Sequence, residues 1–591
     1  MKNLTKLLGL LLIAAPLQAA PDIETQIGHL LRAQGLQGAV WTTLDSQGAA
    51  GASNARTGAA MRVDHRVHVG SIAKTLLAVG VLRMVSEGRL SLETPVAMLL
   101  PHVAIDTPWG PGEPVRIRHL LDHTAGLDDA HLWHVLSMRA GAHTPLAAAV
   151  PAGSPVLRVR HRPGTRTSYS NIGYTLLGMV IETVTGQAYE TYLDTALLAP
   201  LGMRDSSFAF VTQAHDPRLA MGHLEDGATQ PASPSYVRPA GQFTTTAADM
   251  ARLARFLMSD GRLGGKTFID MDLLRAMGEP AGTEAAIAGL ANGYGLGLRR
   301  IDRHGVVAKC HGGSTVGFRA MLCLLPETRQ AFFIAMNADS ETADYSRFDE
   351  VLFRSLQPAQ SPSAPVLAPY PAVEAWEGWY VLAPSRFESF RFLDIVFNAV
   401  HVSKQGQSLT IASLQSAPVT LHHAGGGLFR AAGKRCASHA LVVSAEGVRV
   451  ISTGTQSYEQ VPLAYLLALW LSVAAGLLGL SCIVVKSLLK VATGRLSRRD
   501  PLWAPCAGVL ALLLPIPMFY QQSFLELGDL TLASGVLAAV TAALPAAMLI
   551  GLWQSLRQPS IHRMEAAATL AVLQFCLVLA WWGLLPLRLW G

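Results

Sequence analysis

Apolar residues are distributed unevenly along the 591-residue chain. Up to about residue 460 they alternate with polar residues, as in an ordinary globular protein. Beyond that point they gather in four long runs, at about 461–485, 502–520, 531–553 and 566–587. Each run approaches the roughly 20 residues that a helix needs to cross a bilayer. Because charged loops separate the runs, the pattern predicts four transmembrane helices rather than one buried helical domain.

The pattern before these runs predicts two further domains. Residues 21–357 mix helical periodicity with short β-like runs, and a helix should begin after the capping box Thr246-Ala-Ala-Asp249. Residues 358–373 are rich in proline, which is typical of a linker. Residues 374–460 read as a small all-β domain, lipocalin-like or a β-sandwich. It carries no obvious chemistry, and its role as lid, spacer or partner surface is open.

The N-terminus predicts export. Residues 1–20 hold two lysines, an apolar run at 7–17 and Gln18-Ala-Ala20, as in a cleavable signal peptide. The loop after the first apolar run is basic and the next loop, 521–530, is acidic. The positive-inside rule then places the N-terminal domains in the periplasm of a bacterium, anchored in the inner (cytoplasmic) membrane and its lipid bilayer. The net charge of +6 arises largely in that basic loop, so we expect no nucleic-acid partner.

Three short motifs carry candidate chemistry. Ser71-Ile-Ala-Lys74 opens an apolar helical stretch, where positions i and i+3 share a face. A serine hydroxyl is a weak nucleophile that needs an adjacent base, and Lys74 would supply one. A second S-x-x-K, Ser487-Leu-Leu-Lys490, falls in the predicted cytoplasmic loop and is read as chance. Tyr169-Ser-Asn171 and His311-Gly-Gly313 complete the set.

With these motifs in order, residues 22–355 resemble the class C β-lactamase-like serine hydrolases of the peptidase S12 type. That family includes penicillin-binding DD-peptidases, D-aminopeptidases and esterases, and S-x-x-K is its nucleophile motif. Framework segments strengthen the resemblance: Leu120–Leu127, Glu87–Leu92, Pro200–Met203, Gly241–Thr245 and Tyr294–Gly297. The resemblance implies an α/β (α+β) domain of the β-lactamase/transpeptidase type, with an antiparallel sheet flanked by helices.

The resemblance also implies roles in catalysis. Ser71 attacks the substrate carbonyl and forms an acyl-enzyme. Lys74 and Tyr169 exchange the proton, with the pKa of the Tyr169 phenol lowered by the nearby ammonium. The backbone N–H groups of Ser71 and Ser314 form the oxyanion hole. No cofactor and no metal ion is needed.

Substrate binding falls to Asn171, His311 and Gly313, and here the chain departs from the β-lactamase pattern. That pattern has Lys-Thr-Gly where this chain has His311-Gly-Gly313. A mostly neutral histidine recognises a carboxylate poorly, so a true β-lactamase is the less expected function. His119 and His123 are expected to be structural.

The sequence leaves the substrate open. A peptidase or amidohydrolase acting on a small peptide, including D-residue peptides of the prodrug-activating type, is the leading interpretation. An esterase for acyl or lipid-like substrates is the alternative, and a non-catalytic penicillin-binding sensor represents another class. Cys310 and Cys323 flank a hairpin-like turn near Val316-Gly317 and either form a disulfide or pack as small residues.

Overall fold

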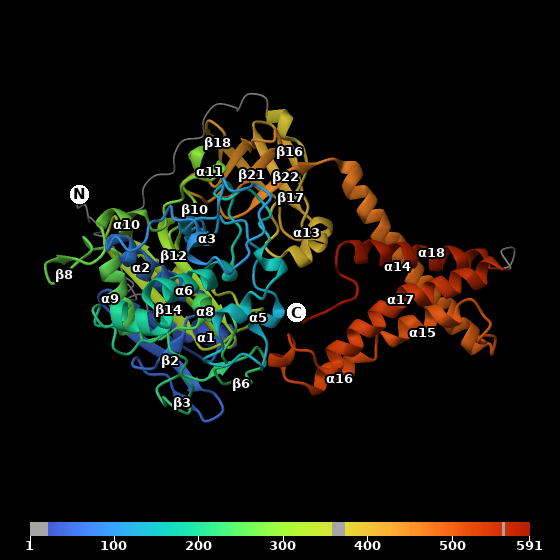
Figure 1. Cartoon of the computed structure of the whole chain (residues 1–591), viewed down its shortest axis with the longest axis horizontal. Coiled ribbons are helices and arrows are strands. Elements are labelled where there is room, and N and C mark those ends of the chain that lie inside the picture. The colour runs from blue at the N-terminus through green and yellow to red at the C-terminus, as the bar shows by residue number, and fades with distance from the viewer. Residues whose placement is uncertain (1–21, 357–372, 558–561, 591) are drawn as a thin grey trace, which may run out of the picture.

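The computed structural model describes residues 22–356, 373–557 and 562–590. The predicted signal peptide at 1–20 and all of the predicted linker except Val373 lie outside these residues. Figure 1 shows three parts: an N-terminal mixed domain, a β-barrel above it, and a group of apolar helices to one side. The chain therefore has the α/β fold, the all-β part and the apolar helices that the pattern predicts.

An eight-stranded antiparallel sheet forms the centre of the N-terminal domain. Its strands follow the order β10 (Gly293–Gly295), β11 (Leu298–Arg303), β12 (Val306–Thr315), β13 (Phe318–Leu325), β14 (Gln330–Met336), β1 (Gly38–Thr43), β2 (Gln47–Asn54) and β3 (Ala59–Ala60). Side chains alternate across the sheet. Along β14, Phe332 and Ile334 enter one core cluster while Phe333 and Ala335 enter the other.

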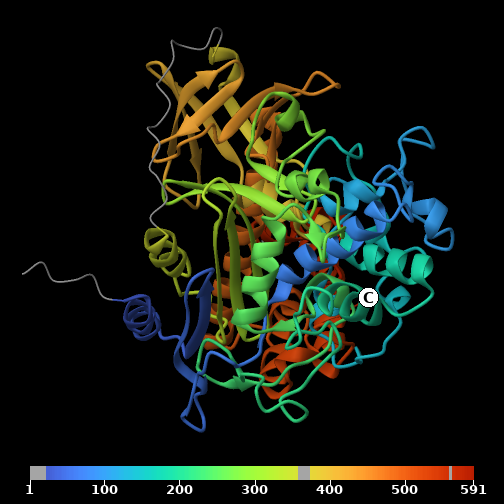
Figure 2. The same ribbon diagram turned by 90° about the vertical axis from the view of Figure 1, so that its left-hand side faces the viewer.

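Helices cover both faces of this sheet, as Figure 2 shows. On one face lie α1 (Ile23–Ala33) and α12 (Ser346–Ser355). On the other lie α2 (Ala73–Ser86), α6 (Asn171–Thr185) and α9 (Ala247–Leu257). The helix α9 begins where its capping box predicts, because the Thr246 side chain accepts the Asp249 N–H. The two-sided cover leaves α2, which follows Ser71, almost wholly buried.

The hairpin of β12 and β13 contains a disulfide. Its register places Cys310 directly opposite Cys323, with a Cα–Cα distance of 4.2 Å, and the two sulfurs are bonded. Of the two outcomes that the sequence leaves open, the structure has the disulfide.

Strands β15 to β22 close into an eight-stranded barrel. The strands are β15 (Gly378–Leu382), β16 (Val400–Gln405), β17 (Ser408–Ser413), β18 (Val419–Gly425), β19 (Leu428–Ala431), β20 (His439–Val443), β21 (Arg449–Ser452) and β22 (Ser457–Val461). Tyr380, Leu409 and Phe429 fill its interior. Between β15 and β16 the chain leaves the barrel wall and forms the short helix α13 (Arg391–Phe397).

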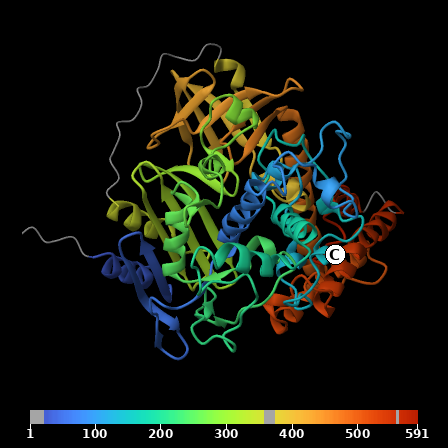
Figure 3. The same cartoon turned by 60° about the vertical axis from the view of Figure 1, so that its left-hand side comes forward.

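The barrel is docked directly on the N-terminal domain (Figure 3). Thr167 Oγ1 donates to Gly454 O at 2.9 Å, and the Arg166 guanidinium pairs with Glu459 at 2.6 Å. At a separate point, the Arg435 N–H donates to Asp302 Oδ2 at 2.6 Å. Because the contacts are spread over several segments of both domains, they fix the orientation of the barrel as well as its position.

Among the described residues, four helical stretches in the C-terminal region are long and apolar enough to cross a membrane. They are α14 (Leu463–Ala492), α15 with α16 (Trp503–Ala511 and Pro515–Gln521), α17 (Leu532–Leu556) and α18 (Arg563–Trp581). The first continues past its predicted end at 485. The second is interrupted before Pro515, since proline lacks the N–H that an unbroken helix needs. The fourth ends at 581 rather than 587.

The apolar helices contact both folded domains. Trp470 Nε1 on α14 donates to Val396 O on α13 at 2.9 Å. In the loop between α16 and α17, the Asp529 carboxylate accepts hydrogen bonds from Ser137 Oγ at 2.5 Å and from the Met138 N–H at 2.9 Å. The helical region is thus attached to the barrel side and to the N-terminal domain.

Candidate active site

Ser71 lies in a tight turn between β4 (Val67–His68) and α2. Gly70, before it, has φ of +51°, and a Cβ there would lie 2.5 Å from Ser314 O. A Cβ on Gly313 would lie 1.8 Å from Val69 O. Only glycines allow these backbones to approach so closely. They bring the backbone of Ser314, on β12, against the turn that carries Ser71.

Lys74 is fully buried and in contact with the Ser71 hydroxyl. Its Nζ donates to Ser71 Oγ at 3.1 Å, Asn171 Oδ1 at 2.6 Å and Ala240 O at 2.7 Å. Burial lowers the pKa of Lys74 to about 7, with Asp129 acting to raise it and Arg386 to lower it further. Near neutral pH a large fraction of Lys74 is therefore the free amine, which is able to accept the Ser71 proton.

The pKa of Tyr169 differs from the expectation. Burial raises the pKa of its phenol well above the ordinary value, and Tyr294 adds to the effect, although the hydrogen bond with Ser71 acts in the opposite direction. The predicted lowering of this pKa is therefore wrong, because desolvation of the phenolate outweighs the hydrogen bond with Ser71 and the charge of Arg386. Tyr169 stands beside Ser71 as a neutral phenol, and Lys74 is the group whose proton exchanges near pH 7.

The His123 side chain packs against the ring of Tyr169. The two rings stack with centroids 4.1 Å apart, and His123 Nδ1 accepts the Ser170 N–H at 3.2 Å. The His123 backbone has φ of +59°, an uncommon conformation for a residue with a side chain. His119 accepts the Arg116 N–H at 3.2 Å at the start of α4 (Ile117–Leu121). Both histidines make internal contacts of a structural kind.

Asn171 begins α6 and joins Lys74 to a buried carboxylate that the motifs do not reveal. Its Oδ1 accepts from Lys74, while its Nδ2 and N–H donate to Asp129 Oδ1 at 2.8 and 2.7 Å. Asp129 is fully buried. Its position two residues after the framework segment Leu120–Leu127 is the one sequence signal that could have indicated it.

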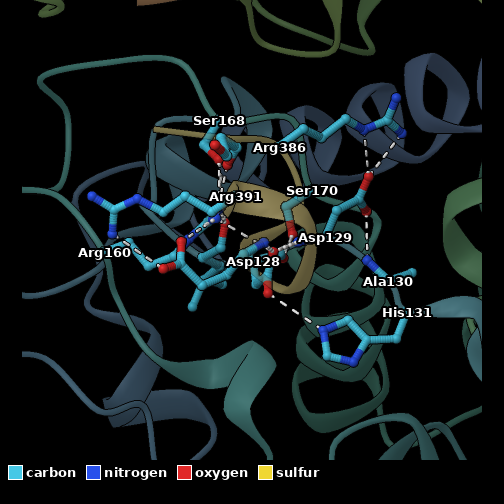
Figure 4. A network of polar contacts seen from close by, with 12 residues as sticks. Asp128, Asp129, Ala130, His131, Arg160, Ser168, Ser170, Arg386 and Arg391 are labelled. Atoms are coloured by element: carbon cyan, nitrogen blue, oxygen red, sulfur yellow. Dashed lines mark hydrogen bonds and ion pairs between the residues drawn. The ribbon is translucent and has the colours of Figure 1, made fainter. Parts of the chain in front are cut away.

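Arg386, in the segment between β15 and β16, reaches this carboxylate from the barrel domain. Its Nε donates to Asp129 Oδ2 at 2.7 Å, as Figure 4 shows. Its guanidinium also lies 4.7 Å from the centre of the Tyr169 ring. The β domain, whose sequence shows no obvious chemistry and whose role the sequence leaves open, thus places a side chain beside Asp129 and Tyr169. Pro384-Ser-Arg386 looks like any surface turn in the sequence, so no pattern could have indicated its contact.

His311 lies on β12, buried, with its ring centroid 6.5 Å from that of Tyr169. Its Nδ1 lies 2.7 Å from Gly312 O, so Nδ1 carries the proton and donates. Burial, followed by the charge of Lys74, lowers the pKa of His311 to about 3. The imidazole is neutral at physiological pH and provides no cation at this position.

These residues surround a cleft of about 1380 Å³. Ser71, Tyr169, Asn171, His311, Gly312, Gly313 and Ser314 line one part of it, and Arg386 and Phe387 of the barrel domain line another. The second S-x-x-K is not part of the cleft. Ser487 lies within α14, and Lys490 pairs with Asp500 at 2.7 Å. The structure thus brings the motifs around Ser71 together and leaves Ser487 apart.

A serine at the start of a buried helix, with a buried lysine on its hydroxyl and Tyr169 and Asn171 beside the pair, is the arrangement of a serine hydrolase of the acyl-transfer class. The family model described as Beta-lactamase matches residues 23–353, and the chain belongs to this family.

Two relatives illustrate how far the similarity extends. Penicillin-binding protein 4 of Amycolatopsis lactamdurans is 29% identical over 342 residues, which cover 55% of this chain and 86% of that protein. Protein flp of Staphylococcus aureus strain N315 is 25% identical over 285 residues, 47% of this chain and only about half (53%) of that protein.

Solved structures are similar as well. SurE is 25% identical with a TM-score of 0.49, the alignment covering 74% of this chain and 98% of SurE. The octameric penicillin-binding protein homologue from Pyrococcus abyssi is 19% identical with a TM-score of 0.48, covering 74% of this chain and 99% of that chain.

Proposed function

We propose that the protein is a membrane-anchored periplasmic peptidase or amidohydrolase that cleaves small peptides, D-residue peptides among them, through an acyl-enzyme on Ser71. One observation carries the proposal. The Ser71 hydroxyl lies 3.1 Å from a lysine amine whose pKa burial lowers to about 7. A binding protein has no use for an amine that is costly to bury and poised to accept a proton.

The reaction follows from this arrangement. Neutral Lys74 takes the Ser71 proton while Ser71 Oγ forms a bond to the substrate carbonyl carbon. The backbone N–H groups of Ser71 and Ser314 stabilise the negative oxygen. When the C–N bond breaks, the leaving amine receives a proton from Lys74 by way of the neutral Tyr169 phenol. Water then attacks the ester, gives its proton back through the same groups, and releases Ser71.

Two observations favour the periplasm and the inner membrane. The disulfide of Cys310 and Cys323 is of the kind that persists in oxidising compartments. The basic loop after α14 and the acidic loop before α17 match the positive-inside rule for an exported N-terminal domain.

His311 favours peptides over β-lactams as substrates. Because this imidazole is neutral, the strand beside the nucleophile lacks the cation that the β-lactamase pattern uses there. Penicillin can still serve as an acylating probe, and the name of the relative penicillin-binding protein 4 supports that choice.

An esterase acting on acyl or lipid-like substrates is the second candidate, since the four apolar helices would hold the cleft near a bilayer. The deciding experiment uses membranes that contain the wild-type protein or its Ser71→Ala variant. Both are screened with N-acyl-D-amino-acid peptides, D-Ala-D-Ala peptides and short-chain esters. We expect Ser71-dependent cleavage of a peptide.

Other outcomes would change the conclusion. Cleavage of esters alone would replace the peptidase with the esterase. Saturable ligand binding without turnover or covalent labelling would instead favour a penicillin-binding sensor.

A further inference from the structure

The barrel domain contributes Arg386 to the wall of the catalytic cleft. This residue lies outside the part of the chain that matches the family model, which ends at residue 353. It is 257 positions from Asp129, with which it forms its ion pair. Residues of two domains therefore line the cleft beside the nucleophile. The part that Arg386 lines is contributed from outside the domain that matches the family model.

Neighbouring contacts hold the Arg386 segment in place. The Glu388 N–H donates to Asp128 Oδ1 at 3.1 Å, and Arg160 Nη1 donates to Ser385 O at 2.8 Å. Figure 4 shows Asp128 and Arg160 of the N-terminal domain in the same network of polar contacts as Arg386. Since the backbone is fixed on both sides of Arg386, the guanidinium is pre-organised and loses little conformational freedom when a ligand binds.

The guanidinium retains unused hydrogen-bonding capacity. Its Nε and Nη2 both approach a single oxygen, Asp129 Oδ2, at 2.7 Å. An arginine has five N–H donors in a planar fork, so the two Nη1 N–H groups and the second Nη2 N–H have no partner among the described residues and are able to bind a ligand. Asp129 is completely buried, whereas 52% of the Arg386 side chain is exposed in the cleft. The pair thus presents its positive partner to the substrate.

Other cations in the described part of the cleft are arranged differently. Arg303 and Arg319 pair with Asp349 and Asp339 at 2.9 and 2.7 Å. Arg299 lies 5.8 Å from the centre of the Tyr294 ring and is the main competitor for an anionic ligand. Arg386 lies 4.7 Å from the ring centre of Tyr169, whose hydroxyl contacts Ser71. Its guanidinium therefore lies beside a side chain that contacts the nucleophile.

We infer that Arg386 binds a carboxylate of the substrate, so that the barrel domain selects peptides with a free carboxylate close to the scissile bond. The inference rests on the proposed hydrolase function and deepens it. A carboxylate accepts two parallel N–H bonds from a guanidinium, which gives both affinity and orientation. The charge that His311 does not supply would come from the barrel domain.

The test compares two peptides that differ only in a C-terminal carboxylate or carboxamide. We expect wild-type protein to prefer the acid. Arg386→Gln should lower kcat/KM for the acid about 10- to 100-fold, mainly through KM, as expected for loss of a charge-assisted hydrogen bond. The carboxamide should lose much less than the acid when both are measured on the high-pH plateau, where Lys74 is the free amine and a shift in its pKa has no effect. Arg386→Lys, which keeps the charge without the fork, should recover part of the loss.

Two further variants act as controls. Arg391→Gln removes a positive charge from the same segment, where Arg391 pairs with Glu388, and should leave the preference intact. Arg299→Gln tests the competing arginine. If Arg299→Gln selectively lost activity on the acid peptide and Arg386→Gln did not, the inference would be overturned.

Failure of this inference differs from failure of the proposed function. The inference is wrong if wild-type protein cleaves both peptides equally. It is also wrong if Arg386→Gln and Arg386→Lys lose activity equally on both peptides, since Arg386 then only joins the domains. In either case the proposed hydrolase function is unaffected. If wild-type protein cleaves neither peptide and a fluorophosphonate does not label Ser71, the proposed function itself fails. Should Arg386→Gln not fold, Arg386→Lys decides the question.

Discussion

Lys74 shows how burial creates a base from a residue that is normally a cation. Its amine has three hydrogen-bond acceptors around it and no exposure to water. Desolvation disfavours the ammonium more than Asp129 stabilises it, which brings the pKa of Lys74 to about 7. Tyr169, equally buried, responds in the opposite sense and stays protonated.

The pH dependence of kcat/KM follows from Lys74. Below pH 7 the lysine is protonated and cannot accept the Ser71 proton, so activity should rise with pH through an apparent pKa of about 7. A pH profile with a neutral amide substrate measures this. A profile that is flat from pH 5 to 8, or one that falls across pH 7, would contradict the role of Lys74 as the base.

The two neighbours of Lys74 should move this profile in opposite directions. Asp129 raises the pKa of Lys74 and Arg386 lowers it. Asp129→Asn should therefore shift the rising limb to lower pH, and Arg386→Gln should shift it to higher pH. The measurement is the apparent pKa of kcat/KM for the carboxamide peptide, which avoids any effect on carboxylate binding. Shifts in the same direction would refute the electrostatic assignment.

At this scale the sequence predicted the residues that short motifs define and missed those that only folding brings together. Ser71 and Lys74 are three positions apart, so helical geometry predicts their contact. Asp129 and Arg386 are 257 positions apart, and no local pattern links them. The direction of the Tyr169 pKa was also missed, because burial is a property of the whole fold.

Among the elements, β12 has the largest influence on the site, since it carries His311 and Ser314 and touches the turn before Ser71. The close approach between β12 and the turn before Ser71 depends on glycines. A Cβ at position 313 would meet Val69 O at 1.8 Å, so the strand or the turn would have to move. A shift of about 1 Å at reacting groups can lower a rate about 100-fold.

Gly313→Ala should therefore reduce acylation of Ser71 by at least about tenfold, and destabilise the domain by about 1–3 kcal/mol through overpacking. The rate of labelling by a fluorescent penicillin measures the first effect and thermal unfolding the second. Gly112→Ala is the matched control, because nothing lies within 4 Å of a Cβ at that position. Equal labelling rates for the two variants would show that the close approach is unimportant.

The disulfide should stabilise the hairpin that holds β12 in place. Cys310 and Cys323 close a loop with a sequence separation of 13, for which loop-closure entropy predicts about 3 kcal/mol. Replacing both cysteines by serine should lower the unfolding temperature, measured with and without reductant. A variant with the same unfolding temperature as the oxidised wild-type protein would contradict this prediction. The sequence could predict the hairpin, but only the register decides whether the two sulfurs meet.

At the scale of the whole molecule, the apolar helices hold the two folded domains at separate points. The contact between Trp470 and Val396 lies on the barrel side, and Asp529 contacts the N-terminal domain at Ser137 and Met138. The run lengths and loop charges predicted the helices, yet these contacts could not be predicted, because one loop carboxylate is like any other in the sequence.

Asp529→Asn should loosen the second attachment. An uncharged amide accepts the Met138 N–H and Ser137 Oγ more weakly than a carboxylate does. Hydrogen–deuterium exchange at residues 137–139 should become faster, while turnover of a short-chain ester changes less than about twofold. Unchanged exchange in this segment would show that the contact does not hold the domain.

The central claim is that Ser71 becomes covalently acylated. Mass spectrometry of proteolytic fragments after reaction with a fluorescent penicillin tests it most directly. The account predicts a mass increase equal to the whole probe on the fragment that contains Ser71, absent in Ser71→Ala. An adduct on another residue, or the same adduct in Ser71→Ala, would contradict it.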